Sequence, residues 1–371
     1  MLRTTFVAAL GFSLVVLAKP MMPRNAPLDR LIKNAGGAVK HDPKDAEAHY
    51  VLGRLLSMKY VGESEVKVFS EGTETTVPHV PGSNVGGHGQ DGATSSVLAG
   101  AIAEFEAAEK LKPDDVRAPL ALGWAHLERA TGKRADAERK AAQLAYERAY
   151  QAGKSQPPHT FGRDAAVEAA QALIDLKVAN ADALRKFIDE TSAAPYDKNV
   201  IMSPVVVLLD GTHELAQAID ARAHVHFDLR ARRDGLAWPW PKAETGLLVW
   251  DPMHDASVVS GHELFGNASW NVFFSDGYRA LALLDDDGDG QLRGAELDGI
   301  RVWLDANHDG VCAPAEVHEL AELEIIAVAA RADAKREGVP SNLRGVTLRD
   351  GRALATFDWT PSSVPEPTAS R

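Results

Sequence analysis

Two short acidic loops constrain the second half of this chain more than any other feature. The first reads DDDGDGQLRGAE (285–296) and the second reads DANHDGVCAPAE (305–316). Both place aspartate or asparagine at positions 1, 3 and 5, glycine at position 6 and glutamate at position 12. The glycine permits the positive φ angle that a sharp turn needs, so the chain can wrap back on itself. Each stretch therefore predicts a tight loop whose side-chain oxygens converge on one point.

The spacing of both loops is that of the EF-hand calcium loop, D-x-(D/N)-x-(D/N)-G-x5-E. Calcium takes six to eight oxygen ligands, including a backbone carbonyl at position 7 and both oxygens of the position-12 glutamate. The alternative is a pair of Asx-type surface turns that cap helices. Two complete matches so close together favour calcium over that alternative. The predicted calcium ligands are Asp285, Asp287, Asp289, Gln291, Glu296, Asp305, Asn307, Asp309, Val311 and Glu316.

The connection between the loops is the eight-residue stretch LDGIRVWL (297–304). We predict one short helix here, which leaves the first loop and enters the second. A conventional EF-hand pair has two helices and a linker at this point, so an opening of two helix pairs is not expected. The spacing favours structural calcium over a calcium sensor. Arg293 should weaken the first site, with Asp286 partly offsetting it, and Cys312 should pack inward.

Residues 204–332 as a whole resemble the calcium-binding region of large secreted bacterial proteins of the haemolysin-type, repeats-in-toxin group. The motifs that are most specific to this group are ELFGN and VWLDANHDGV. The stretch GLLVWDPMHDASVVSGHELFGN (246–267) repeats the loop outline in decayed form. The resemblance implies an α+β domain with EF-hand-like calcium loops, which we place at 198–361.

The decayed outline contains a third acidic loop. It keeps Asp251, Asp255 and Glu263 but has Met253 at a ligand position and Ala256 in place of the turn glycine. Methionine sulfur is a soft ligand that calcium does not favour. We expect this loop to bind calcium poorly, and we expect the Asp-Gly remnants further upstream to be plain turns.

The first half of the chain is predicted to be helical from Leu28 to about Ala194, because apolar residues recur at spacings of three and four. Leu-Gly pairs at Gly53 and Gly123 are each followed by an aromatic residue between alanines, Phe105 and Tyr146. This pattern, over about 28–155, resembles the tetratricopeptide repeat. In such packing, small residues let two helices approach and the aromatic ring fills the gap. The resemblance implies a helical-repeat solenoid whose groove binds a protein or peptide.

The remaining segments complete the predicted organisation. Residues 1–18 combine an arginine with the apolar run FVAALGFSLVVLA, which predicts a secretory signal peptide. The helical domain is placed at 19–195, with an inserted hairpin and loop at about 62–95. Apolar and alternating runs from 198 to 361 predict strands, and 362–371 is predicted to be a disordered tail. The predicted fold is therefore a tetratricopeptide-type helical solenoid followed by a mixed α+β domain with EF-hand-like loops.

Composition and missing motifs narrow the function. The net charge of −12 argues against a nucleic-acid partner. The single cysteine cannot form an internal disulfide. We find no nucleophile elbow, phosphate loop or paired carboxylates outside the loops, so no enzyme is predicted. The two tryptophans Trp238 and Trp240 are expected to pack in a core, with a sugar-stacking patch as the alternative.

These features predict an exported protein, periplasmic, on the cell surface or extracellular, with no integral membrane span after signal cleavage. Its calcium ions would act as a structural brace, and its helical-repeat groove would hold an unidentified protein or peptide. The alternative is a calcium-dependent adhesin or an envelope-assembly factor, and an uncharacterised enzyme is a third, weaker reading.

Overall fold

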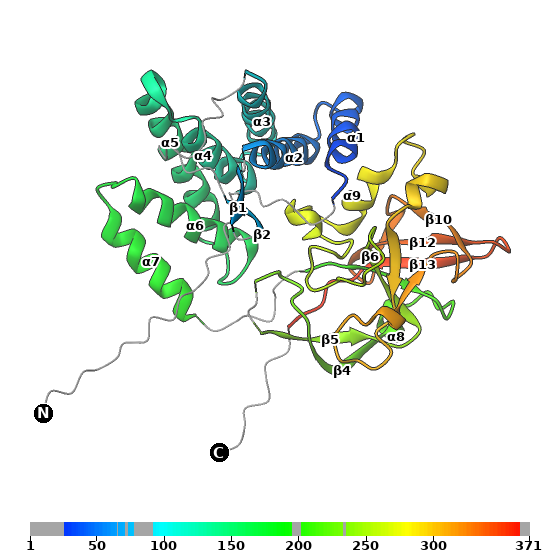
Figure 1. Ribbon diagram of the computed structural model, residues 1–371. Helices are drawn as coiled ribbons and strands as arrows, with labels where there is room; N and C mark the ends of the chain where they lie inside the picture. Colours follow the sequence, from blue (N-terminus) through cyan, green and yellow to red (C-terminus); the bar gives the residue numbers. More distant parts are fainter. Residues whose placement is uncertain are drawn as a thin grey trace, which may run out of the picture.

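The computed structural model describes residues 26–64, 66–70, 73–77, 92–194, 202–232 and 235–363 (Figure 1). The predicted signal peptide, most of the inserted loop and nearly all of the predicted tail lie outside these residues. Helices fill the first half of the described chain, and an antiparallel sheet dominates the second half. A mixed α and α+β organisation is therefore confirmed.

Seven helices form the described part of the first half, and each packs on the next along the chain. They are α1 (Leu28–His41), α2 (Ala46–Ser64), α3 (Gly92–Leu111), α4 (Arg117–Arg129), α5 (Ala135–Gly153), α6 (Phe161–Asp175) and α7 (Ala181–Ala193). Between α2 and α3 lies a hairpin of β1 (Val66–Ser70) and β2 (Thr73–Val77), paired antiparallel. This hairpin falls within the insertion that the sequence predicts.

An aromatic ring packs directly against a glycine backbone at two helix contacts, as the repeat pattern predicts. A β-carbon on Gly53 would lie 2.7 Å from the Phe105 ring, and one on Gly123 would lie 2.5 Å from the Tyr146 ring. Both rings are buried, with Phe105 fully so. The Phe105 ring therefore packs where α3 meets α2, and the Tyr146 ring packs where α5 meets α4. At both places only glycine leaves room for the ring. Assignment of these helices to the tetratricopeptide family stays a prediction.

The second half contains one large sheet, and every pairing in it is antiparallel. Among the described residues it has nine strands in the order β7-β10-β12-β13-β3-β6-β8-β9, with β11 paired to β12. Its strands are β3 (Val205–Leu208), β6 (Thr245–Trp250), β7 (Gln291–Arg293), β8 (Ile300–Trp303), β9 (Val317–Glu319), β10 (Ile325–Ala329), β11 (Ala334–Arg336), β12 (Val339–Leu348) and β13 (Ala353–Asp358).

A separate two-stranded ladder and short helical segments complete the second half. The ladder pairs β4 with β5 in antiparallel fashion. These elements are β4 (Ile219–His226), β5 (Ala237–Pro241), α8 (Leu215–Ala218), α9 (Gly277–Leu281) and the 3-10 turns Ser269–Asn271, Ala282–Leu284, Gly294–Leu297 and Pro314–Glu316.

The large sheet is buried on both faces in its centre. Along β3, Val205 and Val207 join the core that the sheet shares with the helices, whereas Val206 and Leu208 join a second core on the opposite face. This alternation follows from the two-residue period of a strand. Trp238 and Trp240 are fully buried in the second core. Both tryptophans therefore pack in the interior, and the sugar-stacking alternative is wrong.

The helix predicted between the two acidic loops is wrong. The stretch forms a short 3-10 turn that ends at Leu297, followed by strand β8. Gly299 has φ of 87°, which breaks any helix at that point. All four β8 residues are buried between β6 and β9. The β-propensity of Ile, Val and Trp, together with the two neighbouring strands, decides the conformation.

Candidate metal centre

The first acidic loop begins directly after the 3-10 turn Ala282–Leu284 and forms a closed loop around its own first residue. The carboxylate of Asp285 accepts hydrogen bonds from the backbone N–H of Gly288 (2.8 Å) and of Gly290 (2.9 Å). Gly288 and Gly290 have φ of 77° and 86°, which side-chain-bearing residues rarely adopt. Asp287 and Asp289 accept from the amides two positions further along. The loop is held in shape before any ion enters.

The three aspartates of the first loop bring negative charge to one point. One carboxylate oxygen from each of Asp285, Asp287 and Asp289 lies within 4.8 Å of the others. Asp285 is only 7% exposed. Burial raises the pKa of Asp285, and the N–H groups of Gly290 and Gly288 only partly offset this effect. A cation between these oxygens would compensate the buried charge, so the residues fit a hard metal ion.

Glu296, at position 12, closes the first loop. Its two carboxylate oxygens accept hydrogen bonds from the backbone N–H of Asp286 (2.7 Å) and of Arg293 (3.0 Å). The 3-10 turn Gly294–Leu297 carries Glu296 back toward the start of the loop. Gln291, the predicted carbonyl ligand, begins strand β7 and pairs with Ala329 of β10. The loop is thereby attached to one end of the large sheet.

The second loop repeats this arrangement between β8 and β9. Asp305 is 5% exposed and accepts from the amides of Asp309 (3.2 Å) and Gly310 (2.9 Å). Asn307 accepts from the Asp309 amide at 2.9 Å, and Asp309 accepts from the Val311 amide at 2.7 Å. As in the first loop, the position-1 side chain accepts from the position-6 amide, and the side chains at positions 3 and 5 accept from amides two residues further along. The second amide bonded to position 1 differs: it is at position 4 in the first loop and at position 5 in the second.

The second loop also contacts the β4–β5 ladder. A β-carbon on Gly310 would lie 2.5 Å from the carbonyl oxygen of His226, the last residue of β4. Glu316 accepts a hydrogen bond from the Ala313 amide at 3.2 Å. Cys312 is half-buried against the second core, and burial raises the pKa of its thiol to about 12. The thiol therefore packs as a small apolar group, as predicted.

The third, decayed loop keeps the backbone shape of the other two. Asp251 accepts from the amides of Asp255 and Ala256, both at 3.2 Å. The guanidinium of Arg301, with only 8% of its side chain exposed, lies 3.9 Å from the Asp251 carboxylate. Glu263 instead accepts from the amide and hydroxyl of Ser260. The Arg301 guanidinium thus lies beside the buried Asp251 carboxylate, and the Glu263 carboxylate is occupied by hydrogen bonds within its own loop.

Two arginines flank the first loop. Arg293 pairs with Asp289 at 2.7 Å, and Arg331 lies 3.8 Å from Asp285. The charge of Asp286, which was expected to offset Arg293, is engaged elsewhere by the helical half. Burial alone would raise the pKa of Asp286, but hydrogen bonds from Asn34 and Arg30 outweigh burial and lower this pKa. The first loop therefore carries more cationic charge at its edge than the sequence spacing suggested.

Replacement of Arg293 by alanine is expected to raise the calcium affinity of the first loop by up to about fivefold. The change removes the exposed ion pair between Arg293 and Asp289, which frees an oxygen of Asp289 for the metal. An exposed ion pair contributes roughly 0.2–1 kcal/mol, which the metal no longer has to displace. Isothermal titration calorimetry of the full chain measures this affinity. Arg185→Ala removes a similar exposed pair, with Asp182 on α7, and should change nothing. Unchanged or weaker binding in Arg293→Ala would contradict the expectation.

Sequence reasoning missed the contacts that the first loop makes with α1. Arg30 donates to the carbonyl of Leu284 (2.6 Å), and Asn34 donates to that of Leu283 (2.9 Å). Both also bond the Asp286 carboxylate, at 3.1 Å and 2.7 Å. These partners are separated by about 250 positions in the chain, so no spacing pattern could have revealed them.

None of the helices in the described part of the chain is long and apolar enough to cross a membrane. Residues 206–358 match the family model described as the SPM domain. The chain is also similar to the iron-regulated protein FrpA of Neisseria meningitidis serogroup C, with 35% identity over 170 residues. That match covers 44% of this chain and 15% of FrpA. The α+β half, which holds both acidic loops, is therefore the part that is similar to an SPM domain.

Proposed function

We propose that this chain is an exported, non-catalytic calcium-binding protein. Two calcium ions, one in each acidic loop, would brace the α+β half. The observation that supports this proposal is the repeated backbone cage: in both loops the position-1 aspartate is buried and is held by the position-6 glycine amide at 2.9 Å. The bound ion would supply the positive charge that these buried carboxylates need.

The location of each loop supports a bracing role. The first loop runs into β7, at one end of the large sheet, and its entrance is held by α1. The second loop connects β8 to β9 at the other end and contacts β4. Ions at these positions would stabilise the loops where the large sheet meets α1 and where it meets the β4–β5 ladder. Because a strand connects the loops, no helix pair is available to open as in a calcium sensor.

The helical half would serve as a scaffold for a protein or peptide partner. Consecutive helices that pack in pairs offer a continuous inner face suited to such binding. The proposal of export depends on the predicted signal peptide and on the usefulness of calcium sites outside the cytosol, where weak affinity suffices.

Calcium titration of the full chain tests the proposal. We expect two ions per chain, and we expect Glu296→Gln and Glu316→Gln each to remove one of them, because each loses a carboxylate that should bind through both oxygens. Glu324→Gln is a matched control, since Glu324 is exposed and pairs with Arg349 away from the loops. No calcium heat, or heat that both substitutions leave unchanged, would sink the proposal.

A further inference from the structure

A short segment of the α+β half lies against the inner face of the helical half. This segment, residues 271–275, begins at the last residue of the 3-10 turn Ser269–Asn271 and precedes α9. Its main chain is bonded by side chains of α2 and α4. The four hydrogen bonds are Arg54 Nε to the Asn271 carbonyl (3.2 Å), Tyr50 Oη to the Val272 carbonyl (2.8 Å), Arg117 Nη1 to the Phe273 carbonyl (2.7 Å) and the Ser275 amide to Glu47 Oε1 (2.6 Å).

The helices that hold this segment occupy equivalent places in the helical half. The helices α2, α4 and α6 alternate along the chain with α3, α5 and α7. From α6, the ring of Phe161 contacts the Phe273 ring with centroids 5.1 Å apart. The Arg54 guanidinium, from α2, lies over the same ring, 5.4 Å from its centroid. Alternate helices of a solenoid share one face, so these contacts define a groove along α2, α4 and α6.

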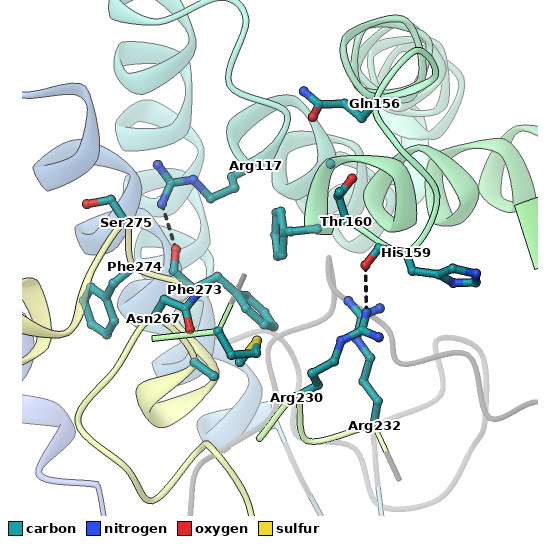
Figure 2. A pocket seen from close by; sticks show the side chains of 14 residues that line it. Arg117, Gln156, His159, Thr160, Arg230, Arg232, Asn267, Phe273, Phe274 and Ser275 are labelled. Carbon is teal, nitrogen blue, oxygen red and sulfur yellow. Dashed lines mark hydrogen bonds between the residues drawn. The ribbon is translucent and has the colours of Figure 1, made fainter. Parts of the chain in front are cut away.

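The contacts are those with which a groove holds a peptide. Three successive carbonyls and one amide of the segment are bonded, and these groups are common to any polypeptide. Specificity would come from Phe273, whose ring contacts both an aromatic and a cationic side chain. Figure 2 shows Arg117 reaching across to the Phe273 carbonyl from the helical side.

The segment is a strained occupant of the groove. Its residues Asn271 and Phe273 have φ of 59° and 67°, and Trp270, directly before it, has φ of 51°, although none of them is glycine. A residue with a side chain in this conformation is strained and persists only where surrounding contacts hold it. The side-chain amide of Asn271 is buried, and neither its nitrogen nor its oxygen has a hydrogen-bond partner among the residues that the structure describes. An unpaired buried amide is also destabilising.

The segment leaves part of the groove unfilled. A cavity of about 320 Å³ lies beside it, lined from the helical half by residues that include Arg117, Gln156 and Phe161, and from the segment by Phe273 and Phe274 (Figure 2). Most of its exposed surface is apolar, and charged side chains, among them Arg117, Arg230 and Arg232, also line it. Apolar walls with polar groups at defined points are typical of a binding pocket at a domain boundary. A longer or bulkier peptide could fill this space and relieve the strain.

We propose that residues 271–275 are an intramolecular ligand of a peptide-binding groove on α2, α4 and α6, which an external peptide with a bulky aromatic residue displaces. This inference rests on the scaffold role proposed above and is independent of calcium. Because residues 271–275 belong to the same chain as the groove, they compete with any external peptide at a high effective concentration, on the order of millimolar for a short connection. External peptides therefore bind the intact chain weakly unless they fit better than the segment does.

A labelled peptide tests this competition. The peptide spans residues 268–276, with both ends blocked, and its fluorescence anisotropy is measured against the full chain. In Phe273→Ala the cis segment loses its ring, so the peptide is expected to bind at least tenfold more tightly than to the unaltered chain. Adding Arg117→Ala removes a groove donor and should abolish that binding. Leu144→Ala, which trims a half-exposed side chain on α5, is the matched control and should behave as the unaltered chain.

Two outcomes overturn the inference. Equal binding to the unaltered chain and to Phe273→Ala shows that the segment does not block the groove. Absence of binding to Phe273→Ala at millimolar peptide shows that the groove does not hold such peptides. Calcium titration of the same variants separates this failure from failure of the calcium proposal, because the loops keep their ligands in every variant.

A second variant covers the case in which Phe273→Ala does not fold. Tyr50→Phe removes only the hydroxyl that bonds the Val272 carbonyl. Hydrogen exchange followed by mass spectrometry is expected to show faster exchange in peptides that cover 268–276, with β3 and β6 unchanged. Exchange identical to that of the unaltered chain would contradict the groove contact.

Discussion

Replacement of Trp240 by alanine is expected to lower the free energy of unfolding of the α+β half by about 3–5 kcal/mol. The indole is fully buried in β5. Its ring contacts those of Phe227, Trp303 and Trp359, with centroids 5.7, 5.8 and 6.3 Å away. Truncation removes these contacts and leaves a cavity that a close-packed aromatic cluster cannot collapse to fill. Denaturant unfolding followed by tryptophan fluorescence and circular dichroism measures the loss.

Trp240→Phe is the matched control for this prediction. Phenylalanine keeps an aromatic ring in the cluster, and it removes a buried indole N–H that has no hydrogen-bond partner in the described part of the chain. We therefore expect a loss of only about 1–2 kcal/mol, since part of the packing loss is offset. Trp240→Ala with a loss below about 1 kcal/mol would show that the cluster does not hold this half together.

Removal of calcium is expected to produce the other large effect. An ion present at one hundred times its dissociation constant stabilises the folded state by about 2.7 kcal/mol, so two sites contribute about 5 kcal/mol. For a domain of this size that corresponds to a fall in Tm of about 10–20 °C when the ions are chelated. Scanning calorimetry with excess calcium and with excess chelator measures the difference.

The double variant Glu296→Gln, Glu316→Gln is the control for the chelation experiment. It should show almost the same Tm with and without calcium, close to that of the chelated unaltered chain. If the unaltered chain has the same Tm with excess calcium and with excess chelator, the ions do not stabilise the fold. Because the chain has two halves, the transition that belongs to the α+β half must be followed by itself.

Part of the fold could be predicted because the relevant contacts are local. The Leu-Gly pairs and the aromatic residues that follow them lie on neighbouring helices, and the structure packs Gly53 against Phe105. Likewise, the pair Asp350-Gly351, which favours a tight hairpin turn, lies between β12 and β13, and these two strands pair. The error at residues 297–304 has the opposite origin. An eight-residue apolar stretch does not distinguish helix from strand, and partner strands from distant sequence decide the matter.

The sequence by itself determined the positions of the acidic loops, because all donors of each loop lie within twelve consecutive residues and the backbone amides that hold them belong to the same loop. Only the tertiary structure decided what surrounds those loops. Arg301 came to lie beside Asp251, and α1 came to hold Asp286. The segment 271–275 came to occupy the groove through Tyr50, 222 positions away. Such contacts depend on how whole helices and sheets pack, and that information is spread over the entire chain.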